Sequence, residues 1–151
     1  MLCDQKDIHM KRLPLILALV AIVAPAWAQT QQPGAHFIEN WDLDGDSVVS
    51  LEDITERRGD VFVSFDANED GALDAEEYMY FDEARANDME NNAGHGKGMR
   101  RASEGMTLAF NDTDGNGEVS RAEFLAHASD WMAILDRNQD GSVTTADFGR
   151  Q

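Results

Sequence analysis

Apolar side chains recur at helical spacing before and after four acidic stretches of the chain. Before three of the stretches, apolar residues lie one, four and five positions ahead of the first acid, which places them on one face of a helix. These sets are Phe37, Ile38 and Trp41, then Val61, Phe62 and Phe65, then Trp131, Met132 and Leu135. One large apolar residue also follows each stretch directly: Ile54, Tyr78, Phe124 and Phe148. The pattern predicts short helices on both sides of each acidic stretch, packed together through these side chains.

The four acidic stretches are twelve residues long, and we number them loops 1 to 4: 42–53, 66–77, 112–123 and 136–147. In each loop a carboxylate or amide side chain stands at positions one, three, five and twelve. Oxygen ligands at this spacing surround a hard cation such as Ca²⁺. The predicted metal ligands are Asp42, Asp44, Asp46, Asp53, Asp66, Asn68, Asp70, Glu77, Asp112, Asp114, Asn116, Glu123, Asp136, Asn138, Asp140 and Asp147.

The loops are also regularly spaced. The first residues of loops 1 and 2 are 24 residues apart, those of loops 3 and 4 are again 24 apart, and the second pair follows the first by 70 residues. A repeat of this kind marks similar supersecondary units that bury their apolar faces against one another. Motif and spacing together resemble the EF-hand superfamily from about residue 35 to the C-terminus. The short spacing within each pair is similar to that of small exported bacterial proteins with four EF hands.

The resemblance implies an all-α fold of two paired EF-hand lobes, built from helix–loop–helix units that bind Ca²⁺. In this family the eighth loop residue forms a short β-bridge to the partner loop. That implies Val49 paired with Leu73, and Val119 with Val143. The corresponding domain organisation is a first EF-hand pair in 29–82, a linker in 83–104 and a second pair in 105–151.

The connections inside each pair are short. Twelve residues separate the two loops, which predicts two short helices with a stop and a start at Gly59-Asp60 and at the equivalent Ser129-Asp130. Glycines alternate through Asn91–Gly98, which predicts a flexible joint between the lobes. The ends of the loops read as helix starts, because each has a capping-box pattern. These patterns are Ser50-x-x-Asp53, Asp74-x-x-Glu77, Ser120-x-x-Glu123 and Thr144-x-x-Asp147.

Loop 1 departs from the family pattern at its sixth position, where Ser47 replaces the glycine that a sharp turn requires. Two interpretations of loop 1 are therefore open: a Ca²⁺ site with four acidic ligands, or a structural hand that only pairs with its neighbour. Loops 1 and 4 end in Asp53 and Asp147, and this shorter carboxylate favours Mg²⁺ as a competitor. Ahead of loop 3, Asn111 stands where the family has an apolar residue.

The N-terminal segment 1–28 reads as a secretory signal peptide, with Met10 as an alternative start. Lys11 and Arg12 precede an apolar run that ends at Pro25, and an A-x-A-like cleavage site follows at residues 26–28. The apolar run is about a dozen residues, short of the ~20 that span a bilayer. We therefore expect a periplasmic or secreted protein that begins at Gln29 and has no stable membrane anchor after cleavage.

The composition is strongly acidic, with 29 acidic and 12 basic residues. Three of the basic and two of the acidic residues lie in 1–28, so the expected exported chain carries nine and 27, a formal charge of −18. A phosphate backbone would be repelled, which excludes nucleic acid as a partner. The single cysteine, Cys3, lies in the same segment and allows no disulfide. No catalytic motif is present, so we expect no enzymatic activity.

Two functions fit this pattern. In the first, the protein is a Ca²⁺ buffer or a Ca²⁺-stabilised structural module. The alternative is a Ca²⁺ sensor that opens an apolar groove to bind a protein partner, with Met89, Met99 and Met106 in the groove and a basic cluster at Lys97, Arg100 and Arg101.

Overall fold

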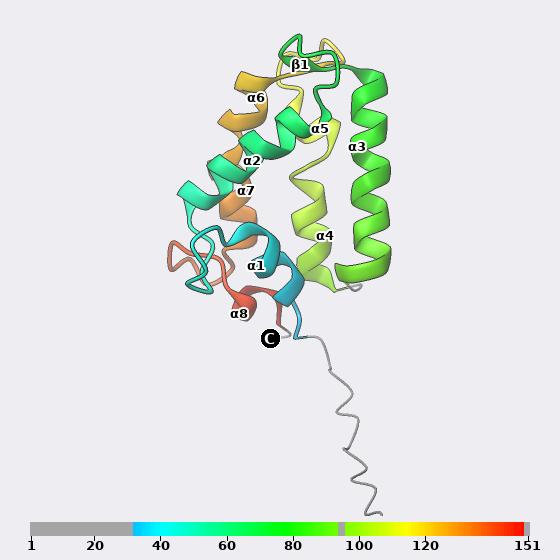
Figure 1. Ribbon diagram of the computed structural model, residues 1–151. Helices are drawn as coiled ribbons and strands as arrows, with labels where there is room; N and C mark the ends of the chain where they lie inside the picture. The colour runs from blue at the N-terminus through cyan, green and yellow to red at the C-terminus, as the bar shows by residue number, and fades with distance from the viewer. Residues whose placement is uncertain (1–31, 94–95, 150–151) are drawn as a thin grey trace, which may run out of the picture.

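The computed structural model describes residues 32–93 and 96–149, and these are mostly helical (Figure 1). The helices are α1 (Ala35–Trp41), α2 (Leu51–Phe65), α3 (Ala75–Asp88), α4 (Lys97–Glu104), α5 (Leu108–Asn111), α6 (Arg121–Ala126), α7 (Ala128–Leu135) and α8 (Thr145–Phe148), with a π-helical segment η1 (Met89–Ala93) after α3. Two short strands, β1 (Ala72–Leu73) and β2 (Val119–Ser120), form the sheet. The predicted signal peptide lies outside the described residues. Within those residues, no helix is long and apolar enough to cross a membrane.

The all-α prediction is confirmed, and most of the predicted core residues are buried, while Trp41, Val61 and Phe65 are partly buried and pack against them. The helical faces flanking the loops meet in one cluster, in which Phe62, Phe124 and Ile54 are fully buried and Trp131 is 1% exposed. Aromatic rings from distant parts of the chain pack edge to face, as Trp41 does on Trp131 at 4.5 Å between centroids. Such contacts add to the hydrophobic stabilisation of the core.

All four capping boxes predicted at the loop ends are present. Ser50, Asp74, Ser120 and Thr144 each cap a helix, and the side chain three residues later accepts a hydrogen bond from the cap's backbone N–H. The last ligand position of every loop is therefore the third residue of the helix that leaves it. Helix position and the geometry of the loop are linked by these bonds.

Helix α2 contradicts the predicted stop at Gly59-Asp60. It runs without interruption from the end of loop 1 to the start of loop 2, and it serves both hands. Gly59 is buried in its middle, where a Cβ would come 3.5 Å from the Arg121 side chain of α6. A glycine costs an exposed helix about 1 kcal/mol, and here the packing of α2 against α6 and α7 outweighs that cost.

The connection between loops 3 and 4 has a break, but not at the predicted place. Helices α6 and α7 are separated by His127 alone, while Ser129 and Asp130 lie inside α7. His127 is both the C-cap of α6 and the N-cap of α7, and its backbone N–H donates to the carbonyl oxygen of Glu123. Loops 3 and 4 therefore lie at the two ends of a bent helical rod.

The loop pairs differ from those predicted. Leu73 pairs with Val119 and Ala72 with Ser120 in the β1–β2 sheet, so loop 2 pairs with loop 3. Val49 forms an isolated bridge with Val143, so loop 1 pairs with loop 4. The pairings of Val49 with Leu73 and of Val119 with Val143 are wrong.

The continuous helix α2 explains the exchange of partners. At 1.5 Å per residue, its 15 residues separate loops 1 and 2 by about 22 Å, too far for a backbone bridge. Loops 2 and 3 meet near β1 at the top of Figure 1, and loops 1 and 4 meet at the lower left.

The segment 83–104, predicted as a linker, contains the end of α3, η1 and α4. Helix α4 packs against α7 and α8 and buries Met99 and Ala102. Trp131 Nε1 donates a hydrogen bond to the carbonyl oxygen of Ala102 at 3.1 Å. The predicted flexible joint falls partly on residues 94–95, outside the described residues.

A buried polar network joins α2 to the second half of the chain. Arg58 of α2 is fully buried, and its Nε donates to the carbonyl oxygen of Phe124 at 2.8 Å. Its Nη2 donates to the Asn111 side chain, and its guanidinium lies 4.2 Å from the centre of the Phe124 ring. Burial lowers the pKa of Arg58 to about 10, because removal from water destabilises the charged guanidinium.

Candidate metal sites

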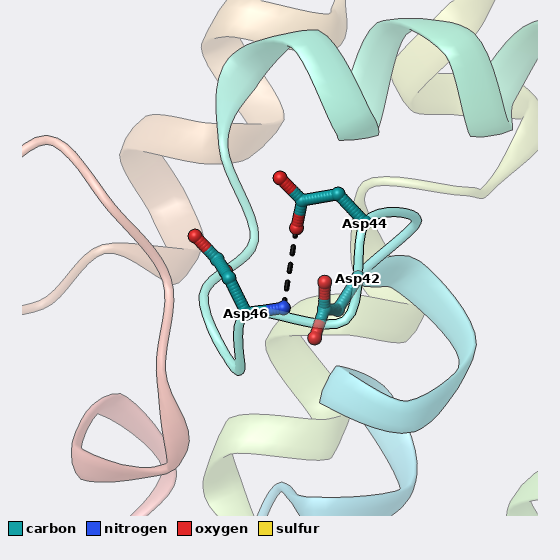
Figure 2. Close-up of side chains that lie close together, drawn as sticks. All are labelled: Asp42, Asp44 and Asp46. Atoms are coloured by element: carbon teal, nitrogen blue, oxygen red, sulfur yellow. Dashed lines mark hydrogen bonds between the residues drawn. The ribbon is translucent and has the colours of Figure 1, made fainter.

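The first three predicted ligands of loop 1 come together directly after α1 (Figure 2). Asp42, Asp44 and Asp46 each offer one carboxylate oxygen, and the three oxygens lie within 4.8 Å of one another. Backbone N–H groups fold the loop around these side chains. Gly45 and Ser47 donate to the Asp42 carboxylate at 2.7 and 2.8 Å, and Asp46 donates to Asp44 Oδ1 at 3.2 Å.

The last ligand position of loop 1 closes the ring from the first turn of α2. Asp53 Oδ1 accepts from the Leu43 backbone at 3.3 Å, and its Oδ2 accepts from the Ser50 backbone at 2.9 Å and from the Ser50 hydroxyl. The Asp53 carboxylate is thus held against both ends of the loop.

Ser47 adopts the left-handed conformation that the sixth loop position was expected to require. Its φ is 70°, while the glycines at the same position of loops 2, 3 and 4 have φ of 86°, 89° and 87°. A side chain in this region costs on the order of 1 kcal/mol. At the sixth position, only loop 1 therefore carries a side chain in this region, whereas loops 2 and 4 have theirs at the fourth position, with Glu69 at φ 58° and Gln139 at φ 59°.

Loop 3 forms the second acidic cluster among the described residues. Asp112, Asp114 and Glu123 offer oxygens within 4.8 Å of one another. Glu123 Oε1 accepts from the Thr113 backbone at 3.1 Å, and its Oε2 accepts from the backbone of Ser120 at 2.9 Å. The Ser120 hydroxyl and backbone bonds lower the pKa of Glu123 and keep its carboxylate ionised.

Loop 2 has an asparagine at the third position and the same backbone pattern. Gly71 donates to Asp66 Oδ2 at 3.1 Å, and Ala67 donates to Glu77 Oε1 at 2.8 Å. Asn68 Oδ1 accepts from the Asp70 backbone at 2.9 Å. Its amide oxygen and the three carboxylates belong to one hydrogen-bonded loop.

Loop 4 repeats this arrangement with a shorter final side chain. Gly141 donates to Asp136 Oδ2 at 2.9 Å, and Asn138 Oδ1 accepts from the Asp140 backbone at 2.9 Å. Asp147 is only 2% exposed and accepts from the Arg137 backbone at 3.0 Å. The same backbone hydrogen bonds thus fold all four loops, but among the described residues three acidic oxygens lie within 4.8 Å of one another only in loops 1 and 3.

The carboxylates of loop 1 influence one another's protonation. Partial desolvation raises the pKa of Asp42, but backbone hydrogen bonds from Ser47 and Gly45 outweigh it, and the pKa lies below its ordinary value. For Asp44 the bond from the Asp46 backbone lowers the pKa. Desolvation and the charges of Asp46 and Asp53 raise the pKa, and together they outweigh that bond. Its pKa therefore lies above the ordinary value. A divalent cation would relieve this repulsion.

The donor sets fit a hard cation. Every predicted ligand supplies a carboxylate or amide oxygen, the ligand type of Ca²⁺ and Mg²⁺ rather than of thiolate- or imidazole-binding metals. Loops 2 and 3 end in glutamate, which is long enough for a two-oxygen grip, whereas loops 1 and 4 end in aspartate.

Sequence reasoning missed a cation beside loop 4. Arg101 of α4 donates from Nη2 to the carbonyl oxygen of Asp147 at 3.0 Å. Burial is the largest cause that lowers the pKa of Arg101, the charge of Arg137 lowers it further, and Asp147 opposes the shift. The clustering of Lys97, Arg100 and Arg101 in the sequence was the available signal, but it did not identify the loop that Arg101 contacts.

The comparison with protein families agrees with the class of protein that the loop motif resembles. A family model described as EF hand matches residues 59–81, which include the second half of α2, loop 2 and the start of α3. This match supports the assignment of the chain to the EF-hand superfamily, and it supports Ca²⁺ binding as the property of that class. No curated protein matches the chain.

Proposed function

We propose that this chain is an exported, non-enzymatic protein whose four loops bind Ca²⁺ and whose fold is stabilised by the bound ions. It acts as a Ca²⁺ buffer or as a Ca²⁺-stabilised structural module. The observation that carries the proposal is the double role of the twelfth loop residue. In all four loops this carboxylate also accepts the hydrogen bond from the backbone of the N-cap residue of the exiting helix, so an ion bound there would hold the helix in place.

The charge balance supports a stabilising role for the ions. The expected exported chain has a formal charge of −18, and four Ca²⁺ ions would reduce it to −10. Without cations, clustered carboxylates such as those of Asp42, Asp44 and Asp46 repel one another and oppose the compact state. Metal binding and folding are then linked equilibria.

Thermal unfolding followed by circular dichroism tests this function. Protein purified after expression of the full chain would be melted in a chelator and at increasing Ca²⁺. One site held at 100 times its Kd adds about 2.7 kcal/mol to stability, so the Tm is expected to rise steadily with Ca²⁺. An unchanged Tm up to about 10 mM Ca²⁺, an order above the weakest sites of the family, would contradict the proposal. Repeating the titration in Mg²⁺ measures its competition at loops 1 and 4.

A specific cavity favours the sensor as the second candidate. An apolar cavity of about 210 Å³ lies among α1, α2, α3, α4 and α7. Its walls include Phe37, Trp41, Phe65, Met89 and Met106. Two of the three methionines named from the sequence, Met89 and Met106, thus line it, while Met99 does not. A Ca²⁺-dependent widening of this cavity would create the groove that a protein partner needs.

ANS fluorescence separates the two candidates. In a Ca²⁺ titration with Mg²⁺ present, a saturable rise would mean that Ca²⁺ exposes apolar surface, and the sensor would be favoured. A saturable fall would mean that Ca²⁺ closes a loose apo state, as the buffer or structural module requires.

A further inference from the structure

The apolar cavity among α1, α2, α3, α4 and α7 is lined by aromatic rings from two parts of the fold. In one group, Trp41 of α1 packs edge to face on Trp131 of α7, with 4.5 Å between ring centroids. In the other group, the rings of Phe65 of α2 and Phe81 of α3 lie 4.9 Å apart. Aromatic rings prefer offset-stacked and edge-to-face neighbours, so this lining is suited to a further ring.

The size of the cavity limits what it can hold. Its volume is about 210 Å³. An apolar cavity of about 150 Å³ is known to bind benzene, so this one admits a somewhat larger molecule such as indole. Protein interiors contain few voids larger than a water molecule, and an unfilled cavity costs stability in proportion to its volume. A ligand of this size would therefore stabilise the protein when it binds.

The charged groups of the cavity wall are already paired. Among the described residues that line it, these are Arg85 and Asp88. Arg85 donates to Asp82 Oδ1 at 2.6 Å and to the carbonyl oxygen of Ser103 at 2.7 Å. The Asp88 carboxylate is hydrogen-bonded to His36 Nε2 at 2.9 Å. A charged ligand would lose its hydration without gaining an unpaired partner, so the wall favours a neutral one.

The cavity reaches the protein surface at α3. Ala84 and Asp88 line it, lie about one helical turn apart and are exposed. The inner wall consists of buried side chains, which include Phe37, Ala102 and Met106. A small molecule can therefore enter past this turn of α3 and become buried against the inner wall.

We propose that this cavity binds a small, neutral aromatic molecule of one or two rings. The bound molecule packs among the rings of Trp41, Trp131, Phe65 and Phe81, and the apolar surface that it buries supplies the affinity. Ligand binding here does not require the proposed Ca²⁺ binding. It assigns the cavity to a small molecule instead of a protein partner.

Isothermal titration calorimetry with indole as the probe tests this site on protein expressed from the full chain. We expect saturable binding. In ¹⁵N–¹H NMR, the side-chain N–H resonances of Trp41 and Trp131 should shift with the same midpoint, while the Gly141 amide in loop 4, outside the cavity wall, should not move. Toluene and benzoate share one ring and differ in charge, and toluene should bind about ten-fold or more tightly than benzoate.

The decisive variant is Ala84→Leu, which fills the outer end of the cavity. Each buried CH₂ group that a ligand loses weakens binding about four-fold, so the Kd for indole should rise about ten-fold or more. Ala86→Leu is the matched control, because Ala86 is exposed on the same helix and does not line the cavity. Its Kd should stay within about two-fold of wild type.

Titrations in a chelator and at saturating Ca²⁺ keep this test separate from that of the proposed function. Saturable binding of indole while Ca²⁺ leaves the Tm unchanged would support the site and contradict the proposed function alone. Lack of saturable binding in both conditions, or equal Kd values for Ala84→Leu and wild type, would overturn the site. Equal affinities for toluene and benzoate would overturn the ligand class. If ANS fluorescence rises with Ca²⁺ while indole stays unbound, the cavity serves a protein partner and the proposed ligand is wrong.

Discussion

Asn111 connects Arg58 to Tyr78 inside the core. Its side-chain oxygen accepts from Arg58 Nη2, and its amide donates to Tyr78 Oη at 3.1 Å and to the carbonyl oxygen of Thr107 at 2.8 Å. All three linked side chains are buried. The residue that departs from the apolar pattern ahead of loop 3 is thus the acceptor for a buried cation.

Replacing Asn111 with leucine, an apolar residue of similar size, should therefore destabilise this protein. The change leaves Arg58 and Tyr78 each without one polar partner, at a cost of about 3 kcal/mol. Urea unfolding monitored by tryptophan fluorescence measures the loss. The exposed Asn87→Leu on α3 is the control and should stay within about 0.5 kcal/mol of wild type. Equal stabilities for Asn111→Leu and wild type would show that the network contributes nothing.

Gly105 permits the close approach of Trp131 at the end of α4. A Cβ at this position would lie 1.8 Å from Trp131 Cδ1. Gly105→Ala should lower the free energy of unfolding by about 1–3 kcal/mol, because the indole must move. Gly96→Ala is matched to it, since nothing lies within 4 Å of its Cβ position and its φ is −75°. If the two variants unfold at the same urea concentration, the predicted clash is wrong.

Relieving the strain in loop 1 should stabilise the Ca²⁺-loaded protein. Ser47→Gly removes a side chain at φ 70°, a gain of about 1 kcal/mol in unfolding free energy. Chemical denaturation at saturating Ca²⁺ measures it. Ser142→Gly in loop 4 serves as the comparison, because Ser142 lies outside the left-handed region and its hydroxyl bonds to Asp140 at 2.7 Å. A gain in Ser142→Gly as large as that in Ser47→Gly would point to a cause other than strain.

Arg101 should weaken cation binding in loop 4, because its positive charge lies beside Asp147. In ¹⁵N–¹H NMR, Arg101→Gln is expected to lower the Ca²⁺ concentration at the midpoint of the Gly141 amide shift about two- to five-fold. This fold-change corresponds to the interaction energy of partly exposed charge pairs. Arg100→Gln on the exposed side of α4 provides the charge-matched control. A midpoint that rises in Arg101→Gln would mean that the hydrogen bond to Asp147 supports the loop more than the charge opposes the ion.

The predicted signal peptide at residues 1–28 can be tested separately. We expect cleavage after Ala28 to give an exported protein that starts at Gln29, which N-terminal sequencing or intact mass measurement would detect. Ala28→Arg should block this cleavage, whereas Ala24→Leu in the apolar run should preserve it. Recovery of the wild-type protein with residues 1–28 attached would contradict the prediction.

Local features of the fold could be predicted because they depend on nearby residues. Helical spacing identified the buried faces of Phe62 and Trp131, and the cap at Ser50 follows from residues three apart. The twelve-residue motif likewise placed each ligand set in one loop.

The choice of loop partners could not be predicted in the same way. It depends on whether α2 continues through Gly59, and that is decided by the packing of α2 against α6, far away in the sequence. The position of Arg58 depends on acceptors from Gly105 to Phe124, which no local pattern connects to it.

The exchange of loop partners also sets the order in which the chain can fold. The bridge between Leu73 and Val119 closes 46 residues, whereas the bridge between Val49 and Val143 spans 94, most of the described chain. Closing the longer loop costs more chain entropy, and contacts so distant in sequence slow folding. We therefore expect loops 2 and 3 to nucleate the structure. Loop 1, although synthesised before the other three loops, must wait for Val143 of loop 4 to emerge before its partner exists.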